Sequence, residues 1–252
     1  IESSAHAGGP LLSFPGGKTA QQKQQAIASI PFQQLNPAAV QKLRGIIDRP
    51  TIYRRLPTET VRCDPGMYVF LVRQPEILVS IWELMEITKV AAKRVGPFQI
   101  SADDGAGTTC DIDLVYGDAN THIYVANGQY DGALVTSPLT GRGVFILRSE
   151  YRRLPDGSSA VTAHMDCFLQ LKNLGADLVA RTLSGVIGST ADQNFTETSK
   201  FFSEISQRAQ ADPQGVKAMA QRLPQVDEKT RADFMRQVDQ TATRAATVAK
   251  LP

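Results

Sequence analysis

Cysteine is scarce in this sequence, and its spacing excludes two common kinds of site. Cys63, Cys110 and Cys167 lie far apart and form no CxxC pair, so neither a zinc ribbon nor a dithiol redox motif is present. An odd number leaves at least one thiol unpaired. The other two form a disulfide only if their Cα atoms come within bridging range, and the sequence leaves that open.

Long apolar runs and concentrated charge are also missing. No stretch approaches the roughly 20 consecutive apolar residues that span a bilayer, so no transmembrane segment is predicted. The chain has 27 Lys and Arg against 25 Asp and Glu, a formal net charge of +2, and its basic residues are scattered. Nucleic acid is therefore not expected as a partner, because proteins that bind it gather Lys and Arg on one face.

The overall composition is that of a folded protein. Hydrophobic residues make up 42% of 252 positions, enough for a substantial core in one large domain with extensions or in two small ones. The sequence begins with Ile1 and not with Met. A removed signal peptide, which would place the chain outside the cytoplasm, is one explanation, and trimming is another. The compartment stays open.

The N-terminal fifty residues contain little apolar surface. Residues 1–20 are rich in Gly, Pro, Ser and Ala, a composition that predicts a flexible arm. Two short helices are expected within 21–50. The second has Asn36 as its N-cap and Pro37 at its first helical position.

The next segment predicts two strands followed by a helix. Residues 51–55 and 67–72 are rich in β-branched and aromatic side chains, which are typical of strands. From Pro75 the apolar residues recur at helical intervals, and Gly96 with Pro97 is expected to end that helix.

Turn residues then separate a series of antiparallel strands up to Lys172. The predicted strands are 108–116, 121–127, 130–136, 144–154 and 159–172, with turns at 117–120, 137–143 and 155–158. Side chains alternate between the two faces of a strand. This alternation predicts one apolar face, which includes Ile112 and Tyr116, and one solvated face, which includes Arg148.

A long helix is predicted at 176–209, where apolar residues lie close to one stripe. About thirty residues at 1.5 Å each would reach about 45 Å, enough to cross a strongly twisted sheet. Residues 212–252 predict two further helices with thin apolar faces. This C-terminal extension is expected to dock on the domain, or to contact a protein partner or a second copy of the chain.

The order of these elements resembles the helix-grip arrangement of the START and Bet v 1-like superfamily. The resemblance rests on QPEILVSIWELMEI at 74–87 after a strand, on the strands that follow, and on the helix that begins with GADLVARTLSGVIG at 175–188. It implies an α+β domain at 51–211. In such a domain a curved antiparallel sheet wraps around a long C-terminal helix, and here extra helices flank it at both ends.

Members of this superfamily commonly hold a lipid, a sterol or another apolar molecule between sheet and helix, and some are cyclases or hydrolases. In this sequence, Arg73 is expected to meet an acidic head group, and inward hydroxyl groups would orient the ligand. The candidate ligand-binding residues are Arg73, Tyr116, Phe145, Leu147, Ser149, Tyr151, Met165, Leu183 and Val186. No cofactor is expected.

Catalytic and metal-binding motifs are incomplete. His164 and Asp166 share a strand face, as a base and its carboxylate would, but that face is expected to be solvated. Asp111 and Asp113 have no third ligand at a useful spacing. The GGKT sequence near the N-terminus lacks the first Gly of a phosphate-binding loop, because that position is Leu12. No catalytic residue and no metal ligand is therefore predicted.

The leading hypothesis is non-enzymatic binding of a hydrophobic small molecule of the lipid or sterol kind. One alternative is an interaction or scaffolding protein with a filled core that acts through its terminal helices. The other is a cyclase- or hydrolase-like enzyme on the same fold, which would need inward polar residues. The strands supply few of these.

Overall fold

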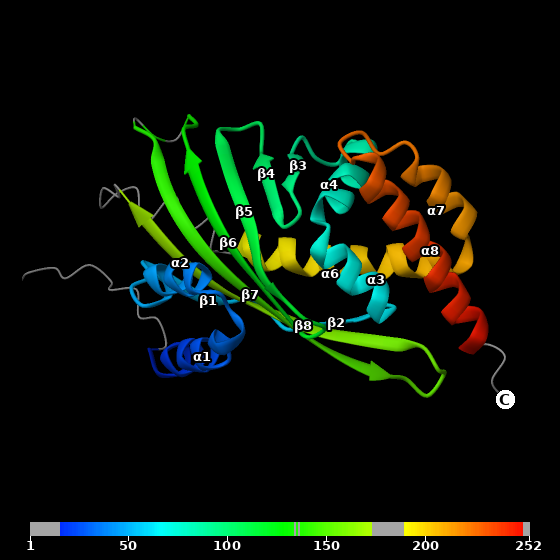
Figure 1. Cartoon of the computed structure of the whole chain (residues 1–252), viewed down its shortest axis with the longest axis horizontal. Coiled ribbons are helices and arrows are strands. Elements are labelled where there is room, and N and C mark those ends of the chain that lie inside the picture. The colour runs from blue at the N-terminus through cyan, green and yellow to red at the C-terminus, as the bar shows by residue number, and fades with distance from the viewer. Residues whose placement is uncertain (1–15, 134, 136, 173–188, 249–252) are drawn as a thin grey trace, which may run out of the picture.

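In a computed structural model, the chain folds into an antiparallel sheet with helices on both of its faces (Figure 1). The structure describes residues 16–133, 135, 137–172 and 189–248. The helices are α1 (Gly16–Ala28), the 3-10 turn η1 (Phe32–Gln34), α2 (Pro37–Ile47), α3 (Pro65–Arg73), α4 (Pro75–Leu84), α6 (Ser189–Ala211), α7 (Pro213–Ala220) and α8 (Glu228–Val248). The strands are β1 (Ile52–Arg55), β2 (Glu59–Arg62), β3 (Ala91–Gly96), β4 (Gln99–Asp103), β5 (Thr108–Gly117), β6 (Thr121–Tyr130), β7 (Leu139–Arg153) and β8 (Ser159–Lys172).

The sheet is a meander from β3 to β8, and the first two strands of the chain form the edge next to β8. Its order is β1-β8-β7-β6-β5-β4-β3, and β2 pairs with β8 beyond β1. The predicted turns at 117–120 and 155–158 join β5 to β6 and β7 to β8, which confirms both. The result is the predicted α+β, helix-grip architecture, with a curved antiparallel sheet, a long helix in the C-terminal part and helices at both ends.

Residues 67–72 form a helix, so the predicted strand was wrong. The side chain of Asp64 accepts a hydrogen bond from the backbone N–H of Met67 at 2.8 Å, and Pro65 takes the first helical position. These two residues are a strong helix-start signal. The helix is apolar on several sides because the sheet, α6 and α8 surround it, with Leu71 and Met67 fully buried.

The helix that begins at Pro75 ends at Leu84 and not at Gly96. The chain leaves it through Glu86, whose φ is 59°, and then forms the edge strand β3. Arg94 on β3 donates to the buried carboxylate of Glu76 on α4, with Nε 2.5 Å from Oε1. This ion pair fastens the edge strand to the helix before it.

The predicted strand at 130–136 and turn at 137–143 were also wrong. β6 ends at Tyr130, and β7 already begins at Leu139. Glycines at 141 and 143 suggested a turn, but they lie inside β7. A Cβ at Gly141 would come within 2.7 Å of a Leu171 methyl carbon, so the missing side chain makes room for a leucine of β8.

The face of the sheet toward α6, called the inner face, carries the larger core. α3, α4, α6, α7 and α8 all contribute to it, together with Leu147 and Val161 of the sheet. Trp82 of α4 packs against Phe201 of α6 with ring centroids 5.6 Å apart, as expected of a core anchor. The described helix α6 covers the second part of the predicted helix 176–209, and residues 176–188 lie outside the described residues.

The apolar faces of α7 and α8 are buried within the chain. Phe234 and Val238 of α8 are both 0% exposed, and Phe234 stacks on Phe70 of α3 with centroids 5.7 Å apart. Arg244 forms a bidentate ion pair with Asp64, the residue that caps α3. The two helices predicted as an extension therefore share a core with α3 and α6.

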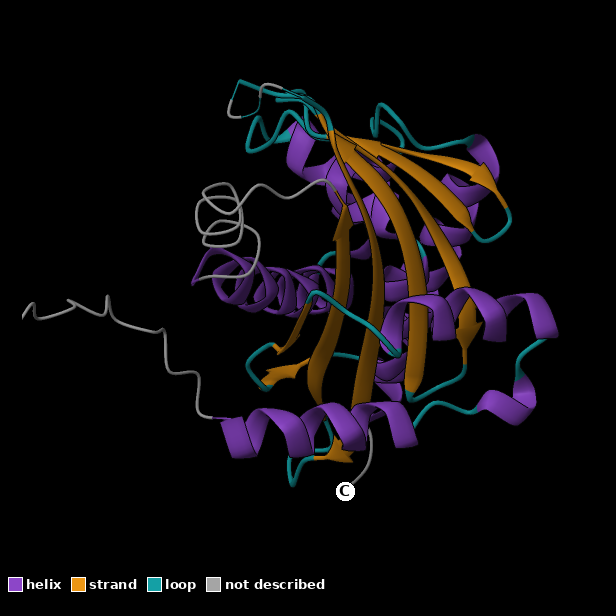
Figure 2. Ribbon diagram, turned by 90° about the vertical axis from the view of Figure 1, so that its left-hand side faces the viewer, coloured by secondary structure: helices purple, strands orange, loops and turns teal. Residues whose placement is uncertain are grey.

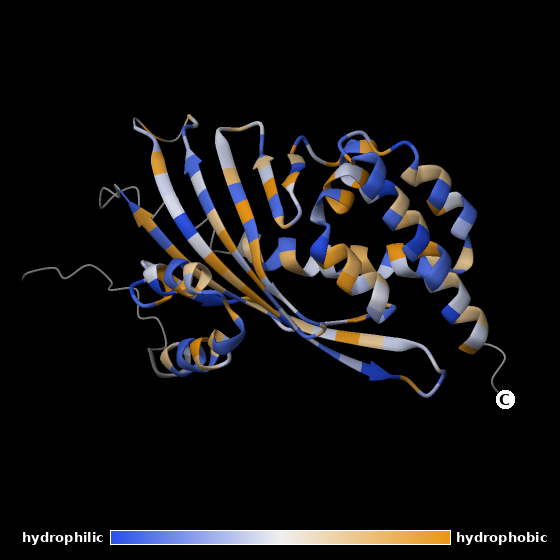
Figure 3. Ribbon diagram, viewed as in Figure 1, coloured by the Kyte–Doolittle hydropathy of each residue, from blue (hydrophilic) through white to orange (hydrophobic). Residues whose placement is uncertain are grey.

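The opposite face of the sheet, called the outer face, is covered in part by α1 and α2, which lie nearest the viewer in Figure 2. The prediction of a solvated face was wrong here. A second core contains Ile123 and Val125 of β6, Val144 and Ile146 of β7, and Phe168 of β8. In Figure 3 these strands alternate between apolar and polar residues, but β7 is apolar at four consecutive positions, 144–147. Such a run is typical of a strand buried on both sides.

A buried ionic cluster lies beneath α1 on the outer face. Asp166 was expected to be solvated, yet it is 0% exposed. It accepts hydrogen bonds from Tyr53 at 2.7 Å and from Nε and Nη2 of Arg55 at 2.8 and 3.1 Å. His164 lies 3.8 Å away, and burial lowers its pKa. Because these partners satisfy Asp166, the cluster is a structural tie between β1 and β8.

Candidate functional site

A cavity of about 480 Å³ lies between the inner face of the sheet and the helices α3, α4 and α6. Most of the side chains around it are aliphatic or aromatic. The lining residues are Ile52, Arg54, Leu56, Tyr68, Leu71, Val72, Pro75, Leu78, Ile112, Tyr124, Phe145, Leu147, Met165, Cys167, Leu169, Ala191, Asn194, Phe195, Thr198, Ser199 and Phe202. A cavity of this size and character fits the usual range for small-molecule sites, about 300–1,000 Å³.

The floor of the cavity is set by the register of β7 on β8. Leu147 lies opposite Met165, and Phe145 lies opposite Cys167, so these four side chains share one patch of the inner face. Each strand has a period of two, which keeps all four on the same side. The sequence pattern predicted this arrangement correctly.

The two phenols and the one basic group of the lining have partners. The Tyr124 hydroxyl donates to the backbone carbonyl of Val72 at 2.6 Å, and the Tyr68 hydroxyl accepts from Ser149 at 3.2 Å. At the β1 side, Arg54 forms an ion pair with Asp192 of α6. The cavity therefore presents mainly apolar surface, with one ionic pair at its margin.

Burial keeps the phenols and the thiol of the lining neutral. Desolvation raises the pKa of the Cys167 thiol to about 12, and it raises the pKa of the Tyr68 and Tyr124 phenols above their ordinary value. All three cysteines of the chain are unpaired thiols. A neutral, buried thiol is a poor nucleophile, so Cys167 contributes packing and not covalent chemistry.

Three of the predicted ligand-binding residues line the cavity: Phe145, Leu147 and Met165. Ser149 and Tyr151 lie further along the same face of β7, in the core between α3 and the sheet. The Tyr151 hydroxyl donates to the carbonyl of Ala119 at 2.6 Å. The structure thus places these two beyond the lining.

Tyr116 lies on the outer face, contrary to the prediction. The register of β5 on β6 shifts between Leu114 and Tyr116, so that Val115 is an extra residue and the alternation reverses. The Tyr116 hydroxyl is 2.8 Å from Oε1 of Gln34, beside α2. Leu183 and Val186 lie outside the described residues.

Arg73 also lies away from the cavity. Its Nε–H donates to Nε2 of His122 at 3.0 Å, and its Nη2 donates to the carbonyls of Gly117 and Asp118. The guanidinium group thereby holds the β5–β6 turn against the end of α3. His122 is fully buried and is neutral at pH 7, and its Nδ1 has no partner among the described residues.

Replacing His122 with Gln is expected to remove part of the acid sensitivity of the fold. Burial, assisted by the Arg73 charge, lowers the pKa of His122 from 6.5 to about 4. The unfolded chain thus binds the proton more tightly. The contribution of neutral His122 to the unfolding free energy is therefore complete above pH 6.5 and is lost as the pH falls through 4. Between pH 7 and pH 4 the wild type should lose about 3 kcal/mol more unfolding free energy than H122Q. Parallel urea-denaturation profiles of the two proteins would contradict this.

Several lining residues were missed because they belong to α3. Tyr68, Leu71 and Val72 were assigned to a strand, so no helical face toward the cavity was expected from them. Asp64 followed by Pro65 is the signal that could have identified this helix. Phe195 and Phe202 of α6, by contrast, lie on the predicted apolar stripe.

These features define a helix-grip α+β protein, in which a curved antiparallel sheet packs against a long helix. Within the described residues, no group of three or more His, Cys, Asp and Glu side chains is placed to hold a metal ion. None of the described helices combines the length and the apolar character needed to cross a bilayer.

Comparison with known proteins gives only distant structural matches. No protein-family model and no curated protein matches this chain. A conserved protein from Geobacillus kaustophilus is 12% identical with a TM-score of 0.41, over 61% of this chain and 96% of its own. Ara h 8.0201, a Bet v 1-type protein, is 13% identical with a TM-score of 0.32, over 58% and 99%. The di-domain ARO/CYC BexL is 17% identical with a TM-score of 0.28, over 76% and 58%. Scores this low carry no argument about function.

Proposed function

We propose that this protein binds a hydrophobic small molecule, of the lipid or sterol class, in the cavity between the inner face of the sheet and α6. The observation that supports this most directly is the lining of the 480 Å³ space, in which aliphatic and aromatic side chains from β7, β8, α3 and α6 converge. Water finds few hydrogen-bond partners in such a space. An apolar ligand, by contrast, is stabilised there because its surface is removed from bulk water.

The chemistry of the lining favours binding over catalysis. The described lining has no histidine, and Asp192 beside it is paired with Arg54. The pKa of each lining phenol and thiol is raised by burial, away from the range in which a general base or nucleophile works. The cyclase or hydrolase alternative therefore lacks a proton-transfer group among the described lining residues.

The scaffolding alternative receives no support from α7 and α8. Their apolar residues are those expected to contact a partner, but Val216, Phe234 and Val238 are buried in the core of the chain itself. A partner that bound through them would have to open this core.

Extraction of the purified full-length chain with organic solvent tests the proposal. Mass spectrometry of the extract should show a lipid or sterol in near-stoichiometric amount with the protein. An empty extract, together with no binding of a fluorescent fatty acid or a fluorescent sterol, would contradict it.

Substituting Met165 with Trp is expected to weaken binding of such a fluorescent probe about tenfold. Met165 lies on the cavity floor opposite Leu147, so the larger ring would occupy ligand space. Overpacking of this kind costs about 1–3 kcal/mol, and 1.4 kcal/mol is a factor of ten. Titration of probe fluorescence measures the change. The control is Val95→Trp, at a position 63% exposed on β3, which should bind as the wild type does. Equal affinities of all three proteins would place the ligand elsewhere.

A further inference from the structure

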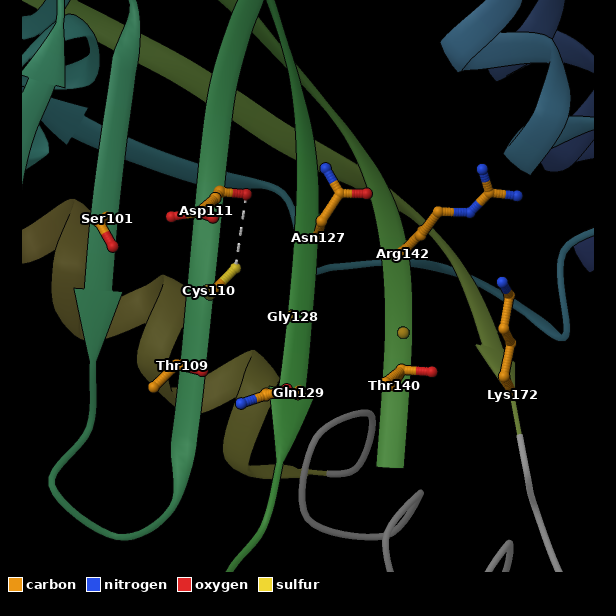
Figure 4. A pocket seen from close by; sticks show the side chains of 11 residues that line it. Ser101, Thr109, Cys110, Asp111, Asn127, Gly128, Gln129, Thr140, Arg142 and Lys172 are labelled. Atoms are coloured by element: carbon orange, nitrogen blue, oxygen red, sulfur yellow. Dashed lines mark hydrogen bonds between the residues drawn. The ribbon is translucent and has the colours of Figure 1, made fainter. Parts of the chain in front are cut away.

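A second hollow, polar in character, lies on the outer face of the sheet, beyond the part that α1 and α2 cover. It has a volume of about 570 Å³ and crosses strands β4 to β8 (Figure 4). Its polar side chains are Ser101, Thr109, Asp111, Asn127, Gln129, Thr140, Arg142 and Lys172. It is separated from the apolar cavity by the sheet itself.

The strand register arranges these side chains in rows across the sheet. Ser101, Asp111, Asn127, Arg142 and Gln170 are successive partners on β4, β5, β6, β7 and β8. The next row along the strands is Asp103, Thr109, Gln129, Thr140 and Lys172. Alternation puts both rows on the outer face. Figure 4 shows Asp111, Asn127 and Arg142 side by side in this order.

Charge is segregated across these rows. The acidic residues Asp103 and Asp111 lie on β4 and β5, the basic residues Arg142 and Lys172 lie on β7 and β8, and β6 between them carries only amides. In the described part of the chain, Asp111, Arg142 and Lys172 form no ion pair. No opposite charge neutralises these groups, although Nη2 of Arg142 also donates to the side chain of Gln170 and to the carbonyl of Gly45.

This pattern selects the kind of ligand. A polyanion would meet Asp111 and a polycation would meet Arg142, so a molecule with a cationic and an anionic end fits better than either. β5 and β7 are two strand spacings apart, about 10 Å. An extended tripeptide has about the same length between its ammonium and carboxylate groups. The Asn127 amide, midway between the charged edges, can both donate to and accept from a peptide group.

The C-terminal end of α2 lies beside the hollow and limits what can enter. Arg142 donates to the carbonyl of Gly45 at 3.3 Å, and Gln170 donates to that of Arg49 at 3.1 Å, so the C-terminal end of α2 borders the hollow. A flat protein surface would meet this helix before it reached the sheet. A short chain lying across the strands would not.

We infer that this hollow binds a short zwitterionic peptide, extended across the strands, with its ammonium group over Asp111, its middle peptide group at Asn127 and its carboxylate between Arg142 and Lys172. The site is independent of the apolar cavity. It would give the protein two ligands of opposite character, one on each face of the sheet.

Isothermal titration of the full-length chain with triglycine, N-acetyl-triglycine and triglycine amide tests this inference. Triglycine should bind at millimolar concentration. Each blocked peptide should bind about fivefold more weakly, because each lacks one exposed charge contact. Equal binding of all three peptides, no binding of any, or preferential binding of a neutral sugar such as glucose would overturn the inference.

Two exposed substitutions identify which end of the peptide lies where. Lys172→Gln should weaken binding of triglycine about fivefold and leave binding of triglycine amide unchanged. Asp111→Asn should weaken binding of triglycine and leave that of N-acetyl-triglycine unchanged. If either variant affects the free and blocked peptides equally, the proposed orientation is wrong. Met165→Trp, which fills the apolar cavity, should bind triglycine as the wild type does, so failure of the cavity proposal and failure of this one are distinguishable.

Discussion

Replacing Phe234 with Ala is expected to lower the free energy of unfolding by about 3–5 kcal/mol. The side chain is 0% exposed on α8 and stacks on Phe70 of α3, so its removal leaves a cavity at the junction of the two helices. Small domains are stable by only about 5–15 kcal/mol, and such a loss is a large part of that. Urea denaturation followed by circular dichroism measures it.

The matched control is Phe98→Ala, which removes the same ring from a position that is 64% exposed. Its unfolding free energy should lie within about 0.5 kcal/mol of the wild type. If α7 and α8 were a separate extension, Phe234→Ala would leave the main transition unchanged. That outcome would contradict the shared core described for α3, α6 and α8.

The second large effect is expected for Asp166→Ala, at about 3–5 kcal/mol of unfolding free energy. Asp166 is fully buried beneath α1, and its removal leaves the Arg55 guanidinium and the Tyr53 hydroxyl without their acceptor. The Arg55 side chain is only 21% exposed, and an uncompensated charge in such a place is costly because the protein solvates it less well than water does. The same denaturation experiment measures this loss.

Two milder substitutions calibrate that result. Tyr53→Phe removes one hydrogen bond to Asp166 and should cost about 1 kcal/mol. Asp239→Ala removes the exposed partner of Lys217 and should change stability little, because water screens that pair. An Asp166→Ala variant no less stable than Tyr53→Phe would show that the cluster is not the tie between β1 and β8.

The antiparallel strands could be predicted because their signals are local. Alternating side chains and the turns at 117–120 and 155–158 identify β5, β6, β7 and β8 without knowledge of their partners. The cavity floor formed by Phe145, Leu147 and Met165 follows from the same alternation. The position of a strand and the side chains that share one of its faces could thus be predicted from the sequence.

The errors arise where tertiary contacts override local preference. Residues 67–72 have side chains typical of strands, but the Asp64 cap and burial among α6, α8 and the sheet make them helical. Tyr116 was assigned to the wrong face because the extra residue Val115 has no distinct sequence signal. The apolar runs at 144–147 on β7 and 123–126 on β6 indicated that both faces of the sheet are covered.

The ion pair between Asp64 and Arg244 joins positions separated by 180 residues. The last described helix therefore completes the core that the first two strands and α3 begin. During synthesis on the ribosome, those early elements lack their packing partners until almost the entire polypeptide has emerged, because a domain folds as a unit. Contacts between residues so far apart in sequence make folding slow, and the nascent chain exposes its apolar side chains until they form.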